Sequence, residues 1–354
     1  MGRRTLSPTA RTGGDKATGM DRRRCLRMGA MAAVVAAAAV RVRAASLHPV
    51  TIQWQADAPL KVLPVRLAQR LGYFAAEGVP VAFEPWSERP PQILPGARLP
   101  VRVTAAGFDT VLRQHWQGQP ELVFLALART PQLGFGLRHP LRAGVELSQQ
   151  LQQARIGVPQ TNRLAQRIAW LVLQAHGAQP RASQFVALPT AQHAQAAFLL
   201  GEVDAVCVGD PLLTGLQRRG AIRVVTDTRH LSESLRLLGG PVLCAGLSTP
   251  AALVESHAAE LQAVGRAVQR ALRWLQTAGP VDLAPHADLA GFAGDPGAFL
   301  SVIMHTRESF AVDAAVDERA IHNVLRILRL LPQGHQYDAI EPTRLYTTRL
   351  VSAG

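Results

Sequence analysis

The chain has 354 residues, of which 48% are hydrophobic and 18% are charged, and this composition excludes a disordered chain and suggests about two globular domains. The formal net charge of +13 is high enough to suggest a nucleic-acid binder. However, residues 1–44 hold ten arginines and lysines and two acids, so this segment carries +8 and the rest of the chain only +5. The basic excess therefore indicates a targeting segment rather than a nucleic-acid partner.

An export signal is predicted at the N-terminus, with the true start placed either at Met1 or at Met20. The basic stretch Arg22–Arg27 precedes an apolar run, Met28–Val40, which is shorter than the roughly 20 residues of a membrane-spanning helix. Val42 and Ala44 then offer small residues at the −3 and −1 positions. This arrangement predicts cleavage after Ala44.

The paired arginines resemble the twin-arginine signal, in which two arginines are followed by any residue, an aromatic residue, leucine and a basic residue. Here Cys25 stands at the aromatic position, which is a departure from that pattern. An ordinary secretory signal and an uncleaved anchor remain the alternatives. The twin-arginine interpretation implies the matching export machinery as a partner.

Apolar runs of strand length alternate with helix-period segments along the rest of the chain. The predicted strands are Val50–Trp54, Val79–Glu84, Val101–Ala105, Glu121–Leu127, Arg155–Val158, Phe185–Leu188, Val203–Val208, Arg223–Thr226 and Val242–Leu247. Apolar residues at spacings of three and four predict helices over Arg163–His176, Ser256–Gln276 and Glu318–Leu331. This alternation favours an α/β architecture with mainly parallel sheets.

The cysteines and lysines are few. Cys207 and Cys244 lie in apolar runs, which predicts buried free thiols, although an oxidising compartment also permits a disulfide between them. The only lysines are Lys16 and Lys61. We interpret the preference for arginine as a coding bias rather than as the demand of a site.

Familiar catalytic and cofactor motifs are missing. The sequence contains no P-loop, no dinucleotide-binding glycine motif, no H-E-x-x-H and no G-x-S-x-G. The eleven histidines lack metal-ligand spacing, and the arginines that share helix faces, such as Arg266, Arg270 and Arg273, are typical of a solvated surface. We therefore expect no catalytic residue, no metal, no cofactor and no nucleic-acid partner.

Four short motifs carry a resemblance to a known family. They are Gly72-Tyr73-Phe74 with Glu77-Gly78 after a helix, Gly118-Gln119-Pro120 before an apolar strand, Ala154–Pro159 before a helix, and Gly201–Ala205 with Asp210-Pro211 beyond it. Together they resemble the solute-binding proteins of ABC importers, in the nitrate/sulfonate/taurine group and its relatives for thiamine-type pyrimidines. The resemblance covers most of residues 48–331. The segment Gly96–Pro100 lacks the Asp of a G-x-x-D element that the family often carries there.

The resemblance implies a type II periplasmic-binding fold, with two α/β lobes, two crossings between them and a ligand cleft. It places residues 45–147 and 240–354 in the first lobe and residues 148–239 in the second. Such a protein is a periplasmic monomer rather than an enzyme. It closes on a small molecule by a hinge motion and delivers it to an ABC permease in the inner membrane.

Candidate ligand-binding residues follow from the rule that ligands of open α/β sheets lie beyond the carboxyl ends of strands, near helix N-termini. Thr161 and Asn162 are the most interpretable pair, since either can cap the helix from Arg163 and that helix end also favours an anion. The full set selected is Asp57, Ala58, Gly107, Phe108, Asp109, Thr130, Thr161, Asn162 and Asp210.

The expected ligand is a sulfonate, nitrate or another oxyanion, or a small heterocycle. The alternatives are an enzyme on the same fold, of the type that makes pyrimidine or menaquinone precursors, and an exported sensor for a membrane signalling protein. The export signal argues against the enzyme, because those pathways are cytoplasmic. The sequence does not separate transport from sensing.

Overall fold

The computed structural model describes residues 47–87, 100–160, 162–332 and 334–351. The predicted export signal and the Gly96–Leu99 stretch lie outside these residues. Residues 47–354 form a compact unit of their own, separate from residues 1–46. In the described ranges, no helix combines the length and hydrophobicity needed to cross a membrane.

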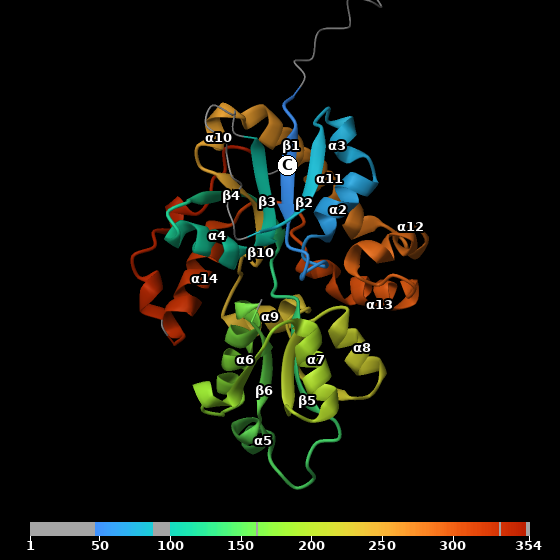
Figure 1. Cartoon of the computed structure of the whole chain (residues 1–354), viewed down its shortest axis with the longest axis vertical. Helices are drawn as coiled ribbons and strands as arrows, with labels where there is room; N and C mark the ends of the chain where they lie inside the picture. Colours follow the sequence, from blue (N-terminus) through green and yellow to red (C-terminus); the bar gives the residue numbers. More distant parts are fainter. Residues whose placement is uncertain (1–46, 88–99, 161, 333, 352–354) are drawn as a thin grey trace, which may run out of the picture. The chain divides into compact units, whose positions relative to one another are not determined.

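The first of two five-stranded sheets has the strand order β2-β1-β3-β10-β4 (Figure 1). Its strands are β1 (Val50–Trp54), β2 (Val81–Pro85), β3 (Val101–Gly107), β4 (Glu121–Ala128) and β10 (Ala245–Pro250). Strand β1 pairs in parallel with β2 and β3, whereas β10 is antiparallel to both of its neighbours. Four of the five strands therefore point the same way, as the alternation of strands and helices predicted.

The second sheet repeats this plan with the order β7-β6-β8-β5-β9. Its strands are β5 (Leu133–Arg138), β6 (Ile156–Pro159), β7 (Phe185–Leu188), β8 (Ala205–Gly209) and β9 (Ile222–Asp227). Strand β5 is antiparallel to β8 and β9, and the other pairs are parallel. In each sheet, the reversed strand is the one that begins just after the chain arrives from the other sheet.

Helices flank both sheets (Figure 1). Those that follow strands of the first sheet are α2 (Leu63–Arg70), α3 (Tyr73–Ala76), α4 (Phe108–Trp116), α10 (Leu253–Ser256), α11 (Ala258–Thr277), α12 (Pro280–Leu283), α13 (Pro296–Thr306) and α14 (Glu318–Leu330). Those of the second are α5 (Leu147–Gln153), α6 (Arg163–Ala175), α7 (Ala191–Leu200), α8 (Leu212–Arg218) and α9 (Leu231–Leu238). Short 3-10 turns are η1 (Ala182–Gln184), η2 (Ala284–Ala290), η3 (Arg307–Ser309), η4 (Gly334–Tyr337) and η5 (Pro342–Arg344).

The longest helix shows why periodic segments were predicted well. In α11, the residues Leu261, Val264, Val268 and Leu272 recur at spacings of three and four, and all are fully buried. One face therefore packs into the core, while Arg266 and Arg270 lie on the other and contact Glu77 and Tyr73. The arginine face is thus a surface, as predicted, and its side chains contact α3 and the turn after it.

The Gly-Tyr-Phe segment has the local structure that its residues predict. Gly72 and Gly78 adopt the left-handed conformation, with φ of 72° and 70°, in which glycine avoids the strain of a Cβ atom. Between them, the Phe74 side chain is 2% exposed in the core and Tyr73 lies beneath the Arg270 guanidinium. The segment ends α2 and turns the chain toward β2.

Strand β5 was not predicted, because its two glycines weaken the strand pattern. The structure gives the reason for both residues. A Cβ atom at Gly134 would lie 2.3 Å from the Leu213 side chain, and one at Gly136 would lie 2.7 Å from the carbonyl oxygen of Arg223. Strand β5 therefore needs glycine where α8 and β9 approach it closely.

The chain passes between the sheets twice, at residues 129–132 and at residues 239–244. The expected start of the returning segment, at 240, lies within the second passage. The first lies earlier than the predicted boundary at 147, since β5 pairs only with strands of the second sheet. We therefore propose lobes of residues 47–128 with 245–351, and of residues 133–238.

Candidate functional site

A cleft of about 360 Å³ lies where strands of both sheets end. Trp54 ends β1, and Pro159 and Gly209 end β6 and β8, so the carboxyl ends of parallel strands from each lobe face the same space. The lining residues are Trp54, Ala56, Asp57, Ala58, Pro59, Leu60, Lys61, Arg66, Gln132, Leu133, Pro159, Asn162, Ala191, Gln192, Val208, Gly209, Asp210, Pro211, Leu212, Asp288 and Gly291.

Four of the nine residues selected from the sequence line this cleft. They are Asp57 and Ala58, which follow β1, Asn162 at the start of α6, and Asp210, which follows β8. Thr161 lies outside the described residues. The strand-end rule thus brings together residues from both lobes.

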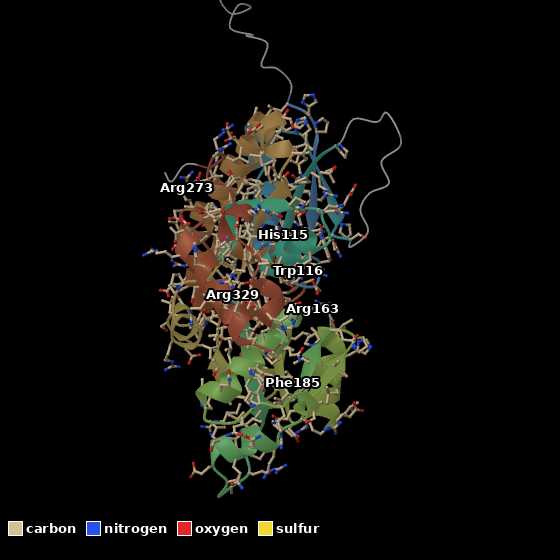
Figure 2. The ribbon with its side chains drawn as sticks, turned by 90° about the vertical axis from the view of Figure 1, so that its left-hand side faces the viewer. His115, Trp116, Arg163, Phe185, Arg273 and Arg329 are labelled. Atoms are coloured by element: carbon tan, nitrogen blue, oxygen red, sulfur yellow. The ribbon has the colours of Figure 1, made fainter. Side chains whose placement is uncertain are left out.

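Three other selected residues lie elsewhere, at the start of α4. The Gly107 N–H donates to the Gln55 side chain at 3.0 Å, and the Phe108 N–H donates to the carbonyl of Cys244 at 3.1 Å. Phe108 and Asp109 line a separate apolar cavity, of about 50 Å³, between α4, α6 and α14. Those helices face the viewer in Figure 2, where Trp116, Arg163 and Arg329 mark them. The returning chain before β10 therefore takes the Phe108 N–H at this helix end.

Thr130 is also absent from the cleft lining. It lies in the first passage between the lobes, is 0% exposed, and its hydroxyl has no hydrogen-bond partner among the described residues. Its neighbour Gln132, which was not selected, reaches the cleft instead.

Asp210 lines the cleft, but its carboxylate is committed to the protein. Its side chain is fully buried and accepts hydrogen bonds from the N–H and hydroxyl of Thr214 at 3.0 and 2.7 Å and from Arg229 at 2.9 Å. Arg229 also pairs with Asp227 at 2.6 Å. Burial alone would lower the pKa of Arg229, but the two carboxylates raise it above its ordinary value. The group is a buried ion-pair network that ties β8, α8 and β9 together.

Lys61 is the charged group that the sequence analysis missed. It is 7% exposed, it lines the cleft, and in the described part of the chain no acceptor lies within hydrogen-bond or ion-pair distance of its side chain. A charge on a largely buried side chain costs free energy when it has no partner, so proteins rarely keep one without a use. Its only signal in the sequence was that it is the sole lysine beyond the export signal, two residues before a helix.

Helix N-termini add positive potential around Lys61. Residues at the starts of α6 and α7 line the cleft, and neither helix has an acidic residue in its first turn. The Asn162 side chain caps α6 by accepting from the Ala165 N–H at 3.2 Å, and Thr190 caps α7. Lys61 itself lies just before α2, which also lacks an acid in its first turn. Such helix ends favour anions.

Arg66 and Trp54 form one wall of the cleft. The Arg66 guanidinium lies 4.6 Å from the centre of the Trp54 ring and donates to the carbonyl of Leu289 at 2.9 Å. Burial lowers the pKa of Arg66 below its ordinary value. The nearby Asp288 is paired with Arg70 at 2.8 Å, and although burial opposes it, this pairing holds the pKa of Asp288 below its usual range.

Gln132 offers an acceptor beside these cations. Its Nε2 donates to the Ser309 hydroxyl at 2.8 Å, while its Oε1 is buried without a donor among the described residues. Gln132 has a φ of 55°, an uncommon value for a residue other than glycine. The cleft therefore presents both a cation and an acceptor that lack partners.

Cys207 and Cys244 are free and buried, as predicted. Burial raises the pKa of each thiol to about 12, although the charge of Lys61 acts against the shift in both cases. Cys207 lies in β8 and Cys244 in the returning passage, so Lys61 is close to both lobes. The thiols stay protonated and serve as small apolar core residues.

Residues 60–278 match the protein family described as NMT1/THI5 like. The chain belongs to this family. No relative among the curated proteins matches the sequence. The family match begins at the residue before Lys61 and extends through α11, so it includes most of the cleft.

Solved structures show the same fold. A protein of Bordetella bronchiseptica RB50 is 23% identical, with a TM-score of 0.69 over 86% of this chain and 95% of that one. The alkanesulfonate-binding protein SsuA from Xanthomonas axonopodis pv. citri, bound to MOPS, is 18% identical, with a TM-score of 0.60 over 87% and 98%. The nitrate-binding protein NrtA from Synechocystis PCC 6803 is 14% identical, with a TM-score of 0.65 over 86% and 87%. The predicted periplasmic-binding fold is thereby confirmed.

Proposed function

We propose that this protein is an exported receptor that captures a small anion in the cleft and delivers it to an ABC permease in the inner membrane. One observation carries the proposal, namely the ammonium group of Lys61, which lines the cleft on a residue that is only 7% exposed and has no partner among the described residues. A bound oxyanion would supply the acceptor that this group lacks. Hydrogen bonds to charged groups contribute about 1.5–3 kcal/mol each, more than most neutral ones.

The charge balance of the cleft supports an anion. Of the three carboxylates in the lining, Asp210 is neutralised by Arg229 and Asp288 by Arg70. Only Asp57 at the exposed rim lacks an ion pair within the described residues, whereas Lys61 and Arg66 both line the cleft. The uncommitted charge is therefore mostly positive, and the helix ends of α6 and α7 add to it.

The ligand class follows from chemistry and size. We assign a sulfonate, nitrate or another oxyanion, with a small heterocycle as the remaining option, because Trp54 offers a flat apolar surface beside the cations. A volume of about 360 Å³ suits a small molecule. The names of two structural relatives, an alkanesulfonate-binding and a nitrate-binding protein, point to the same class.

We assign ligand contacts to Lys61, Gln132 and three of the residues selected from the sequence, Asp57, Ala58 and Asn162, and we retain Thr161 as a further contact. Gly107, Phe108, Asp109 and Thr130 are assigned to the scaffold instead, because none of them lines the cleft. The two lobes close on the ligand by motion at the passages 129–132 and 239–244. We propose that the receptor acts as a monomer.

The export route is part of the proposal. We infer a twin-arginine signal with cleavage after Ala44 and a periplasmic location. Changing Arg22 and Arg23 to lysine is expected to leave the precursor uncleaved in the cytoplasm, which cell fractionation measures. Normal export of this variant would instead support the general secretory route.

A ligand screen tests the main proposal, using residues 45–354. Thermal unfolding is followed with alkanesulfonates, nitrate, carboxylates and neutral heterocycles, and with choline as a cationic control. At a ligand concentration 100 times Kd, stabilisation should be about 2.7 kcal/mol. Stabilisation by choline alone, or by none of the compounds, would overturn the anion-receptor proposal.

The two alternatives are separated by what happens to the ligand. We propose that the protein is not an enzyme, so a stabilising compound should be recovered chemically unchanged after long incubation, as measured by mass spectrometry. Conversion of the compound would favour the enzyme on this fold. Uptake that continues at full rate in a strain lacking the protein would favour the sensor over the transport receptor.

A further inference from the structure

Two histidines and a glutamate meet at the edge of the first sheet opposite the cleft. His48 lies just before β1, whose far end, Trp54, lines the cleft. His257 precedes the first residue of α11, and Glu260 lies in the first turn of that helix. One donor atom from each residue lies within 4.8 Å of the other two. Sequence spacing does not reveal this cluster, because His48 and Glu260 are 212 residues apart.

Glu260 holds the cluster together with its two oxygens. Its Oε1 lies 2.7 Å from Nδ1 of His48 and accepts a second hydrogen bond, of 3.1 Å, from the His48 N–H. Its Oε2 lies 3.7 Å from Nδ1 of His257. The carboxylate is 7% exposed and lies between the two imidazoles.

His257 is the member of the cluster whose hydrogen-bonding requirement is not met. Its Nδ1 is buried and has no hydrogen-bond partner among the described residues, although it faces the carboxylate. The two imidazole rings stand edge to face, with centres 5.4 Å apart and planes at 83°. The His257 nitrogen and the Glu260 carboxylate are two Lewis bases that lie next to each other, and a metal ion could bind both of them.

We propose that His48, His257 and Glu260 form a Zn²⁺ site. In a tetrahedral site with bonds of 2.0–2.2 Å, ligand atoms lie about 3.3 Å apart. The observed nitrogen–oxygen separations, 2.7 Å to Oε1 and 3.7 Å to Oε2, lie on either side of that value, and one ligand atom from each residue lies within 4.8 Å of the other two, so the three side chains would draw together around the ion. Two imidazoles and one carboxylate suit zinc rather than calcium or magnesium, which prefer oxygen alone.

The site has the ligand number of an open zinc centre, with a fourth position left for water. The site joins His48, just before β1, to the start of α11. Bound zinc would therefore hold the segment before β1 against the first lobe. The cleft lies at the other end of β1, and its ligand chemistry does not involve these three side chains. Zinc binding and anion binding should therefore be independent of each other.

Titration of residues 45–354 with ZnCl₂, on protein made without a histidine tag, tests the site. We expect one Zn²⁺ per chain by calorimetry and a higher midpoint of thermal unfolding with metal. H257A should lower the zinc affinity at least tenfold. The matched control is H322A, which removes an exposed histidine of α14 and should bind as the unaltered protein does.

Further variants keep the test decisive if H257A fails to fold. H48A removes a donor whose side chain is 55% exposed, and it should lose zinc while remaining folded by circular dichroism. Co²⁺ in place of Zn²⁺ should give the visible absorption of a four-coordinate ion, and this absorption should disappear in both variants. No bound zinc in the unaltered protein, or zinc binding in H48A and H257A as tight as in the unaltered protein, would overturn the proposal.

Discussion

Lys61 is the residue on which the proposed ligand chemistry depends. Replacing it with methionine removes the ammonium group but keeps the length of the side chain. We expect Kd for the anion to rise about 10- to 150-fold, as the loss of a hydrogen bond to a charged group predicts. The free energy of unfolding should stay the same or increase, because an unpartnered charge on a largely buried side chain is lost.

Calorimetry and urea denaturation measure the two effects of K61M separately. K61R serves as the matched control, since it keeps the charge and should retain part of the affinity. If K61M bound the anion as tightly as the unaltered protein, Lys61 would not be a ligand contact. If it bound weakly but was also much less stable, the lysine would have a structural role.

Asp210 and Asp57 both line the cleft, but they should respond in opposite ways. D210N breaks a fully buried pair with Arg229 and is expected to lower the free energy of unfolding by about 3 kcal/mol, because Asp227 still neutralises part of that charge. D57N changes an exposed carboxylate that has no partner among the described residues, so stability should not change. Its effect should be tighter anion binding, since a repulsive charge is removed.

Denaturation curves and binding isotherms of the two asparagine variants check this contrast. The folded fraction of D210N should bind the anion with nearly normal affinity. A large loss of affinity in D210N without loss of stability would return Asp210 to the ligand contacts, as the sequence alone had suggested.

At the scale of the elements, the close packing of β5 against α8 and β9 depends on its two glycines. An alanine at Gly136 would place its Cβ 2.7 Å from the backbone oxygen of Arg223, which cannot move without disturbing β9. We expect G136A to destabilise the protein by about 3 kcal/mol, at the upper end of overpacking costs. G215A, in the interior of α8 with its nearest neighbour at 3.7 Å, should instead stabilise it by about 0.5–1 kcal/mol.

Urea denaturation of G136A and G215A provides the comparison, because both variants add one methyl group in the second lobe. Equal effects would mean that the close approach of β5 and β9 does not limit this sheet. A lower stability for G215A than for the unaltered protein would show that α8 tolerates less than its geometry indicates.

Helices whose apolar residues repeat regularly were predictable from the sequence. Elements determined by contacts with segments distant in sequence were not. The buried faces of α6, α11 and α14 repeat every three or four residues, so the sequence predicts them locally. Strand β5 was missed because its glycines are explained only by α8 and β9. The start of α4 was assigned to the cleft because nothing near Phe108 in sequence reveals that Cys244 takes its N–H.

The strand-end rule had the same limit at the candidate site. It selected Asp57, Asn162 and Asp210, which directly follow strands or precede helices. It passed over Lys61, which reaches the cleft from the end of a longer loop, and Gln132, which lies in the passage between lobes. The rule locates the edge of a sheet, but it does not show which side chains there already have partners.

At the scale of the whole molecule, an ion pair joins the two lobes. Arg218, at the end of α8, contacts Asp295, which caps α13, and near it a Cβ at Gly291 would lie 3.5 Å from Pro211. The pair is exposed, with 62% and 47% of the two side chains accessible, so its strength is limited by solvent. It can nevertheless favour the arrangement in which the lobes face each other.

Replacing Arg218 with alanine should therefore speed ligand release more than it slows binding. The altered residue is Arg218 rather than Asp295, because Asp295 also accepts the Ala298 N–H at the start of α13. We expect the dissociation rate measured by stopped flow to increase by less than about fivefold, and the difference from the unaltered protein to shrink at high salt. R219A, which changes the next residue and removes no ion pair among the described residues, should leave the rate unchanged. An effect of R218A that persisted in 1 M salt would mean that packing at Pro211 and Gly291, rather than charge, holds the lobes together.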